Sequence, residues 1–178
     1  MEIVKTDLKD AYFIANDKFE DERGFFMESF NLKKFKKNIK IRSFVQDNHS
    51  KSSRNVLRGL HYQIKHPQGK LVRCISGTIY DVIVDLRESS PSFGKWFGIV
   101  LDDSRNQLWV PPGFAHGFCT ATDFAEVEYK VTDYYYPKYD RTLIWNDPTI
   151  NIEWPSLNPI LSEKDMKGKT FEECEKYV

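Results

Sequence analysis

Two histidines lie in short polar segments that also contain glycine. His61 belongs to LRGLHYQIKHPQGK, which ends at Lys70, and His116 belongs to PPGFAHGF. Imidazole titrates near pH 6.5, so a neutral histidine can accept a proton at physiological pH. A lysine ammonium or a second histidine can stabilise negative charge that develops on an oxygen atom. These residue types therefore suit proton abstraction from a carbon next to a carbonyl group.

The spacing around the histidines argues against a metal centre. A metal-binding cupin barrel needs an H-x-H pair and a carboxylate on its first motif and a P-x-G-x-x-H second motif, because a divalent ion takes three or four converging ligands. Pro111, Gly113 and His116 complete the second motif, but Gln63 stands two residues after His61. An amide oxygen is a weaker ligand than imidazole. We therefore expect no metal and no cofactor.

A tyrosine opposite the base could return a proton to the other face of the substrate carbon. The segment EYKVTDYYYPKY offers five candidates, which are Tyr129, Tyr134, Tyr135, Tyr136 and Tyr139. Most of them suit aromatic positions on strands better than an acid role. Composition alone does not choose among them.

Two aspartates share one face of an expected strand. Side chains alternate along a strand, so Asp81, Ile83 and Asp85 lie on one face of the segment from Tyr80 to Leu86. Buried acids need partners or water. We favour a salt-bridged or hydrogen-bonded face over a catalytic role for either acid.

Composition limits the classes of protein. A chain of 178 residues suits one core, so we expect one domain over residues 1–178. The 26 basic and 26 acidic residues balance, which excludes the broad positive field of a nucleic-acid binder. Three widely spaced cysteines favour reduced thiols over disulfides or a zinc site. No apolar run suits a signal peptide or a membrane span, so we expect a cytoplasmic protein.

Most of the chain has the pattern of short strands. Runs such as LVRCI, TIYDVIVDL, WFGIVL, QLWVP, GFCTA and VEYKV are rich in β-branched and aromatic residues, and turn residues separate them. This spacing predicts an antiparallel sandwich or barrel. Helices are expected over Asn31–Asn38 and Ser162–Tyr177, each of which begins with a residue suited to N-capping.

The ordered motifs of the chain resemble the dTDP-4-dehydrorhamnose 3,5-epimerase family, which consists of cupin-fold enzymes of deoxysugar nucleotide biosynthesis. The resemblance covers nearly the whole chain and rests on FEDERGFFMESF, FVQDNHSKS, LRGLHYQ, PQGKLV, DLRESSPSFGKW, PPGFAHGF, YKVTDYYYP, WNDP, IEWP and LSEKD. It implies an all-β, cupin-type antiparallel barrel of the jelly-roll kind with a few short peripheral helices.

The resemblance also implies catalytic roles. His61 is the expected general base, Asp165 orients it as a histidine–carboxylate pair, and Lys70 steadies the enolate oxygen. Tyr129 matches the proton donor, because the motif Y-x5-Y-x-P then places Tyr135 where the family stacks a tyrosine on the nucleotide base. Both epimerised carbons flank the C4 ketone, so enolate formation is the shared step.

Further residues carry over as substrate-binding positions. They are Arg23, Glu28, Gln46, Asn48, Arg58, His116, Tyr135, Asp140 and Lys164. The planar guanidinium of an arginine suits a diphosphate. Asp140 stands where the family commonly has glutamate, one methylene longer. Family members are typically homodimers, so Arg23 and Glu28 could serve the neighbouring subunit's site; a surface ion pair is the alternative for both.

The expected substrate is a nucleotide-diphosphate 4-keto sugar. The first hypothesis is C3 and C5 epimerisation of dTDP-4-dehydro-6-deoxyglucose, a step of dTDP-L-rhamnose synthesis for lipopolysaccharide or capsule. The second is a C3-only or C5-only epimerase, or one that acts on a GDP-linked sugar. A non-catalytic cupin that binds sugar nucleotides and a metal-dependent cupin are further alternatives. A nucleic-acid partner is not expected.

Overall fold

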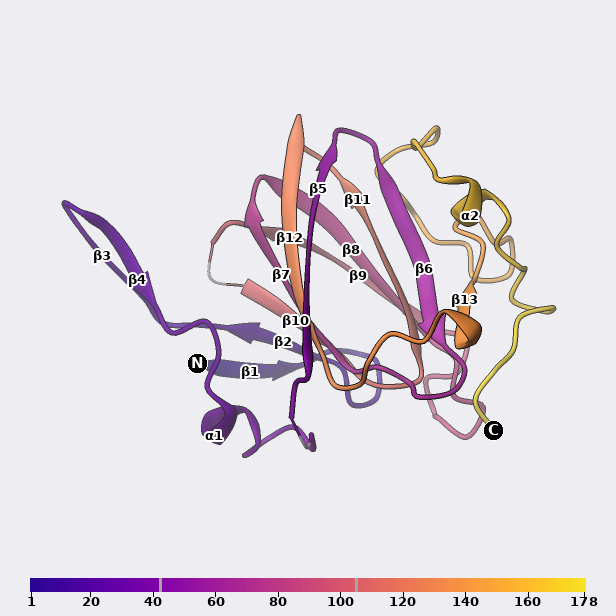
Figure 1. Ribbon diagram of the computed structural model, residues 1–178, viewed down its shortest axis with the longest axis horizontal. Coiled ribbons are helices and arrows are strands. Elements are labelled where there is room, and N and C mark those ends of the chain that lie inside the picture. The colour runs from indigo at the N-terminus through magenta and orange to yellow at the C-terminus, as the bar shows by residue number, and fades with distance from the viewer. Residues whose placement is uncertain (42, 105) are drawn as a thin grey trace.

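Two antiparallel sheets form the central sandwich of the protein, as Figure 1 shows in the computed structural model, which describes residues 1–41, 43–104 and 106–178. The larger sheet has the strand order β1-β2-β10-β7-β12-β5 and the smaller one β13-β6-β11-β8-β9. The strands are β1 (Glu2–Lys5), β2 (Tyr12–Ala15), β3 (Lys18–Asp21), β4 (Gly24–Met27), β5 (Gln46–Ser53), β6 (Leu57–Gln63), β7 (Lys70–Ser76), β8 (Thr78–Asp85), β9 (Trp96–Asp102), β10 (Asn106–Val110), β11 (Phe114–Thr120), β12 (Phe124–Val131) and β13 (Asp140–Thr142). The prediction of an all-β protein of the jelly-roll kind is confirmed.

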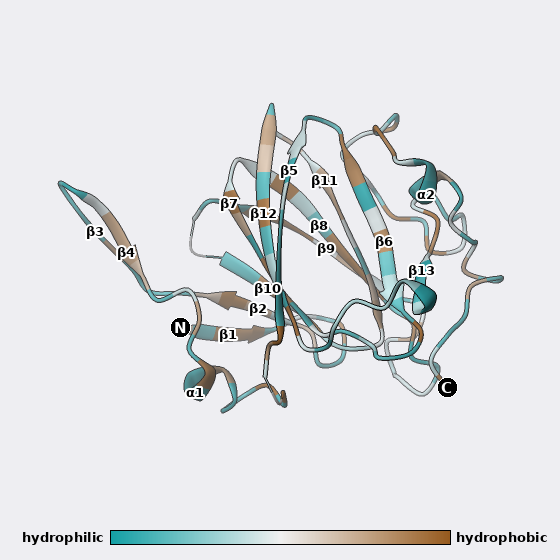
Figure 2. Ribbon diagram, viewed as in Figure 1, coloured by the Kyte–Doolittle hydropathy of each residue, from teal (hydrophilic) through white to brown (hydrophobic). Residues whose placement is uncertain are grey.

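The main core lies between the two sheets. Alternate side chains of the strands point inward and form one apolar cluster, for example Val72 on β7, Ile83 on β8, Leu108 on β10 and Val127 on β12. Figure 2 shows this alternation as bands of brown and teal along β6 and β12. Burial of these side chains holds the sheets together and fixes which residues of each strand face the interior.

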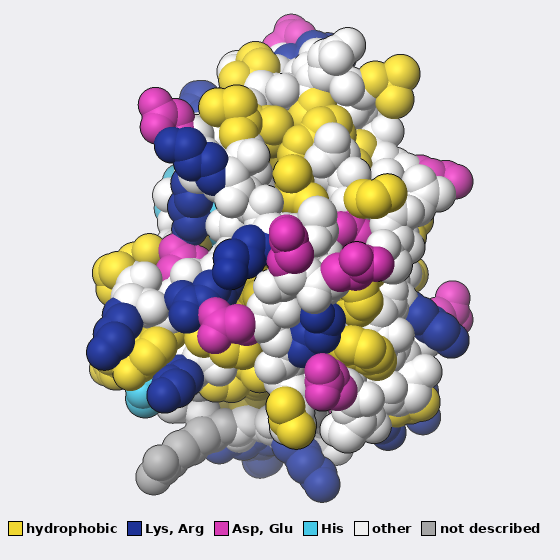
Figure 3. Space-filling model, turned by 90° about the vertical axis from the view of Figure 1, so that its right-hand side faces the viewer, with side chains coloured by type: hydrophobic (Ala, Val, Ile, Leu, Met, Phe, Trp, Pro, Cys, Tyr) yellow, Lys and Arg dark blue, Asp and Glu magenta, His cyan; other side chains and the backbone are white. Residues whose placement is uncertain are grey.

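Both outer faces of the sandwich are partly covered. The segment after β13 covers one outer face: its aromatic side chains Trp154, Phe171 and Tyr177 pack against the outer face of β8 and β11. In Figure 3, which shows this side of the molecule, hydrophobic side chains gather at the upper end, and basic and acidic ones mix across the middle. On the other sheet, Phe35 packs against Trp109 with ring centroids 5.3 Å apart.

One half of the interior is polar, and this half positions the site. Strands β5, β12 and β7 of the larger sheet face β13, β6 and β11 of the smaller one, and inward side chains on these strands include Asn48, His61, Lys70, His116 and Tyr129. The apolar cluster fills the other half, around β8, β9 and β10. The fold therefore places polar groups from both sheets around a shared space.

The two helices are shorter than predicted. Helix α1 covers Leu32–Phe35, and the Asn31 side chain caps it by accepting a hydrogen bond from the backbone of Lys34. A short 3-10 helix, η1, covers Pro137–Tyr139.

The prediction of a helix over residues 162–177 is wrong, because α2 covers only Glu163–Met166. The chain then runs beside Leu143, where the N–H of Lys169 donates to the carbonyl of Thr142 and the N–H of Ile144 donates to that of Lys169. These tertiary hydrogen bonds replace helical ones. Among the described residues, no helix has the length and apolar character needed to cross a bilayer.

The β3–β4 hairpin projects away from the sandwich (Figure 1). Its three phenylalanines, Phe19, Phe25 and Phe26, are exposed by 65%, 59% and 71%. Large apolar side chains at this level of exposure are a feature of surfaces that meet another molecule.

Candidate active site

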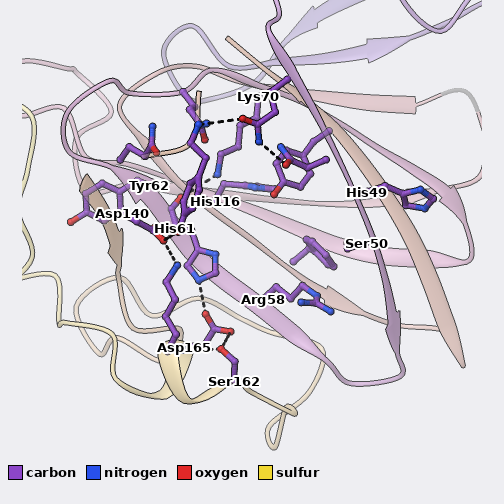
Figure 4. Close-up of a pocket in the computed structure, with 18 residues that line it drawn as sticks. His49, Ser50, Arg58, His61, Tyr62, Lys70, His116, Asp140, Ser162 and Asp165 are labelled. Carbon is purple, nitrogen blue, oxygen red and sulfur yellow. Dashed lines mark hydrogen bonds and ion pairs between the residues drawn. The ribbon is translucent and has the colours of Figure 1, made fainter. Parts of the chain in front are cut away.

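A cavity of about 380 Å³ lies between the sheets at their polar half. Figure 4 shows the side chains that line it, which come from β5, β6, β7, β11, β12, β13, α2 and the loops next to them. They are Gln46, Asn48, His49, Ser50, Arg58, His61, Tyr62, Gln63, Gln68, Lys70, His116, Phe118, Tyr129, Tyr135, Asp140, Ser162, Lys164 and Asp165. Every predicted site residue except Arg23 and Glu28 is in this set.

The two histidines are neighbours on adjacent strands, where His61 of β6 pairs directly with His116 of β11. The glycines beside them allow this close approach. A β-carbon built on Gly59 would lie 2.5 Å from the α-carbon of Gly117, and Gly59 has a positive φ of 127°. The glycines near the two histidines in the sequence are therefore needed because β6 and β11 come too close together there for a side chain.

His61 forms a tight pair with Asp165. Its Nε2 lies 2.6 Å from Oδ1 of Asp165, and the hydroxyl of Ser162 donates to the other carboxylate oxygen at 2.7 Å (Figure 4). Burial would raise the pKa of Asp165, but the hydrogen bonds from His61 and Ser162 lower it below its usual value. The carboxylate stays charged and holds the Nε2 proton, so Nδ1 of His61 is the nitrogen that can act as a base.

Lys70 lies on the opposite sheet and is 7% exposed. Its ammonium donates to the carbonyl oxygen of His61 at 3.3 Å. Burial lowers the pKa of Lys70 from 10.5 to about 8, while the nearby Asp140 and Asp81 oppose this shift. Lys70 therefore provides a buried cation beside the proposed base at neutral pH.

Tyr129 belongs to β12 of the larger sheet, so it comes to the cavity from the wall opposite His61. The Lys70 ammonium lies 6.0 Å from the centre of its ring, and the His116 ring centre lies 6.3 Å from it. Burial raises the pKa of the Tyr129 phenol, with Asp140 adding to the shift and Arg58 opposing it. The phenol keeps its proton near neutral pH, which suits a proton donor.

His116 is 5% exposed and has a carboxylate partner of its own. Its Nε2 lies 2.6 Å from Oδ1 of Asp81 on β8. The alternation expected for Asp81, Ile83 and Asp85 is confirmed. Asp81 bonds to His116, and Asp85 accepts hydrogen bonds from Arg87 and two serines.

The cavity mouth carries a linked group of polar side chains. Oδ2 of Asp140 accepts a hydrogen bond from the Tyr135 hydroxyl at 2.8 Å and pairs with the Lys164 ammonium. Burial and the bond to Asp140 raise the pKa of Tyr135 to about 12. Gln46 links Asn48 to Tyr135. Its side-chain NH₂ donates to the Asn48 side-chain oxygen at 2.8 Å, and its side-chain oxygen accepts from the backbone N–H of Tyr135.

Arg23 and Glu28 lie outside the cavity of their own chain. Arg23 is on the projecting hairpin with its side chain 85% exposed and pairs with Asp21. Glu28 accepts hydrogen bonds from Lys34 at 2.7 Å and Asn31 at 3.0 Å.

Gln63, which breaks the H-x-H pair, binds backbone groups. Its amide donates to the carbonyls of His66 and Tyr134 at 2.8 and 3.0 Å and accepts from the N–H of Tyr136. Gln63 therefore ties down the loop that carries Tyr135. In the described ranges, no cluster of histidine, cysteine, aspartate or glutamate has the arrangement of a metal site.

The sequence reasoning missed some cavity residues. Ser50 lies two positions after Asn48 on the same face of β5, so strand alternation could have found it. Ser162 has the sequence pattern of a helix cap, and its hydroxyl also bonds Asp165. Phe118 and Tyr62 have the pattern of ordinary strand aromatics, and no sequence signal marks them.

Comparison with known proteins gives a consistent result. The family model for dTDP-4-dehydrorhamnose 3,5-epimerase matches residues 5–173. The chain is 50% identical to the dTDP-4-dehydrorhamnose 3,5-epimerase of Shigella flexneri over all of both proteins. It is 56% identical to that of Neisseria gonorrhoeae, where 99% of this chain spans 54% of the longer relative.

A solved structure is also closely similar. The crystal structure of dTDP-6-deoxy-D-glucose-3,5-epimerase from Legionella pneumophila, in complex with dTDP-4-keto-L-rhamnose, has a TM-score of 0.94 and 42% sequence identity. The match covers 98% of this chain and 94% of that one.

Proposed function

The chain belongs to the dTDP-4-dehydrorhamnose 3,5-epimerase family, and from this premise we propose that it epimerises dTDP-4-dehydro-6-deoxyglucose at C3 and C5 to give dTDP-4-dehydrorhamnose. The observation that carries the proposal is the geometry of the cavity. His61 on β6, paired with Asp165 of α2, faces Tyr129 and Lys70 on the strands of the other sheet.

Proton abstraction is the first step of the proposed reaction. Nδ1 of His61 takes the proton from a carbon that flanks the C4 ketone, and the electron pair moves to the ketone oxygen to give an enolate. Asp165 holds Nε2 and stabilises the imidazolium that forms. The Lys70 ammonium stabilises the enolate oxygen, because this atom carries the negative charge that develops in the reaction.

Reprotonation comes from the opposite wall. Tyr129 donates its phenolic proton to the same carbon on the other face, which inverts that centre and restores the ketone. The support for this role is that Tyr129 and His61 come from different sheets, so a sugar ring between them meets an acid and a base on its two faces. The imidazolium of His61 then releases its proton to solvent and the phenolate of Tyr129 takes one up. The same pair serves the second carbon once the ring is repositioned.

The polar residues at the mouth suit the nucleotide part of the substrate. Arg58 and Lys164 provide charge for the diphosphate, and Tyr135 provides an aromatic face for the base. Gln46 and Asn48 add amide donors and acceptors on β5. Asp140, shorter than the glutamate common in the family, is already bonded to Tyr135 and Lys164, so it sets the position of both side chains.

We also propose a homodimer in which the β3–β4 hairpin of one subunit reaches the cavity of the other. Support comes from the hairpin itself, which projects from its own sandwich with three exposed phenylalanines. Arg23 and Glu28, the two expected binding residues outside the cavity, lie on or next to this hairpin. Mixed dimers of an Arg23→Ala chain and a His61→Ala chain test this arrangement. One site of each mixed dimer combines the intact cavity of the first chain with the intact hairpin of the second, so activity should return.

Proton NMR in deuterium oxide tests the proposed reaction. The protein is incubated with dTDP-4-dehydro-6-deoxyglucose, with and without a chelator, and deuterium is followed at each sugar carbon. Deuterium at both C3 and C5 is the expected result, and exchange at one carbon would identify a mono-epimerase. Loss of exchange with the chelator would instead favour a metal-dependent cupin, and no exchange would direct the search to GDP-linked 4-keto sugars.

A further inference from the structure

One side chain of the cavity differs chemically from the others. Among the lining residues of the described ranges, only Phe118 has a side chain without a nitrogen or oxygen atom. The tyrosines do not provide a second wall of this kind. Tyr129 is the proposed acid, and the hydroxyl of Tyr135 is hydrogen-bonded at the mouth. Tyr62 packs its ring in the outer apolar cluster, where its hydroxyl donates to a backbone carbonyl at 2.7 Å.

Phe118 lies where the apolar and polar halves of the interior meet. On β11, Phe114, His116 and Phe118 alternate toward the inside, and both phenylalanines belong to the main apolar cluster. Phe114 does not line the cavity, whereas Phe118 does. The rings of Phe118 and Tyr129 have their centres 6.5 and 6.3 Å from that of His116. The apolar wall therefore stands at the reacting end of the cavity.

A cation is the immediate neighbour of this wall. Phe118 of β11 pairs directly with Arg58 of β6, and both residues line the cavity. Side chains of directly opposite residues lie on the same face of an antiparallel sheet. Nε of Arg58 donates to the hydroxyl of the buried Ser52 at 2.9 Å, which fixes the guanidinium at this place. The residue that we assign to the diphosphate thus lies next to the phenyl ring.

The sugar of the proposed substrate has one apolar substituent. In a 4-keto-6-deoxyhexose, C6 is a methyl group bonded to C5, and every other substituent of the ring carries oxygen. C5 flanks the ketone, so the methyl group is attached to a reacting carbon. C5 and C1 both bond to the ring oxygen, so the methyl group also shares one edge of the sugar with the diphosphate on C1. A residue that is close to both Arg58 and the reacting groups can therefore contact this methyl group.

We propose that Phe118 contacts the C6 methyl group and makes the site selective for 6-deoxy sugars over sugars that keep a hydroxyl at C6. This inference rests on the proposed function, because the roles of Arg58, Lys70 and Tyr129 set the orientation of the sugar. A hydroxyl at C6 would lose its hydrogen bonds to water against the phenyl ring and find no partner on that side. Such a loss weakens binding.

Binding of two unreactive sugar nucleotides tests the selectivity on the unsubstituted protein. dTDP-6-deoxyglucose and dTDP-glucose differ only in the oxygen on C6, and neither has the ketone that the reaction needs. Titration calorimetry should give a Kd for the 6-deoxy compound that is lower on the order of 10-fold or more. Equal Kd values would overturn the proposal.

Two matched substitutions assign the selectivity to the phenyl ring. Phe118→Met and Phe118→Gln introduce unbranched side chains of similar length, of which only the second is polar. The methionine variant should keep most of the preference for the 6-deoxy compound, and the glutamine variant should lose it. Phe114→Met is the control for a loosened core, because Phe114 lies on the same strand and in the same cluster but outside the cavity, and it should leave the preference unchanged.

A full preference in the glutamine variant would assign the contact to another residue and reject the proposal. If this variant fails to fold, Phe118→Tyr takes its place, because it keeps the ring, adds one hydroxyl and should also reduce the preference. Deuterium exchange on dTDP-4-dehydro-6-deoxyglucose reports on the proposed function separately. Exchange at both carbons with equal Kd values rejects the role of Phe118 alone, whereas a clear preference in Kd without any exchange rejects the reaction and supports the apolar contact.

Discussion

Replacing Lys70 with methionine should stabilise the protein while it damages the reaction. The ammonium of Lys70 is buried between the sheets, and burial lowers the pKa of this group from 10.5 to about 8. The pKa of Lys70 is thus lower in the folded chain than in the unfolded one. At neutral pH this difference in pKa reduces the unfolding free energy by about 3 kcal/mol, because the folded state keeps the charge in its interior. Methionine has a similar shape and no charge.

The hydrogen bond from Lys70 to the His61 carbonyl is lost in the variant. Such a bond contributes about 1 kcal/mol, so the net gain in unfolding free energy should be about 2 kcal/mol at pH 7. The gain also depends on pH in a defined direction. Between pH 8 and 10.5 the unfolded chain binds more protons at Lys70 than the folded one, so the unsubstituted protein gains stability as pH rises through this window. By pH 9.5 the advantage of methionine should shrink by about 2 kcal/mol.

Urea unfolding of both proteins at pH 7 and pH 9.5 measures these differences, because all other titrating groups are shared. Lys70→Arg serves as a control that keeps the charge and should not be stabilised. The reasoning is refuted if the methionine variant is no more stable at pH 7, or if its advantage is the same at both pH values.

Three further predictions concern the reaction and the site. Tyr129→Phe should slow completed inversion more than deuterium exchange, because abstraction precedes reprotonation; equal losses in the same NMR experiment would make Tyr129 a binding residue. The rate of exchange should fall as pH rises through about 8, since Lys70 then loses its charge, and a pH–rate profile that stays flat to pH 9 would contradict this role. Asp140→Asn should bring the pKa of Tyr135 down from about 12, which a difference titration against the unsubstituted protein detects by tyrosinate absorbance.

Much of the site follows from the sequence because its residues lie on strands. Alternation along a strand fixes which side chains face inward, and the motifs place Lys70, His61 and His116 on three such strands. The resemblance to the family then supplied Asp165 and Tyr129, which are distant in sequence from His61. Asp165 reaches His61 through the placement of α2 beside β6, and Tyr129 reaches the cavity from the opposite sheet. The register that sets His61 opposite His116 is a tertiary feature, and no local pattern predicts it.

The errors arose where tertiary contacts outweigh local preference. The residues after Met166 have the composition of a helix, yet they pair with the strand-like segment at Leu143. The partner of His116 was equally hidden: the sequence indicated that Asp81 needs a partner but not which one. The position of the β3–β4 hairpin relative to the sandwich also depends on contacts that no short motif encodes.

Deuterium incorporation by the His61→Ala variant tests the central claim most directly. The account assigns proton removal next to the ketone to Nδ1 of His61, held in place by Asp165. In deuterium oxide, with dTDP-4-dehydro-6-deoxyglucose as substrate, the variant should show no exchange at C3 or C5 above the background without protein, while the unsubstituted protein labels both carbons. Substantial exchange by a folded variant would contradict the account and assign the base to another residue.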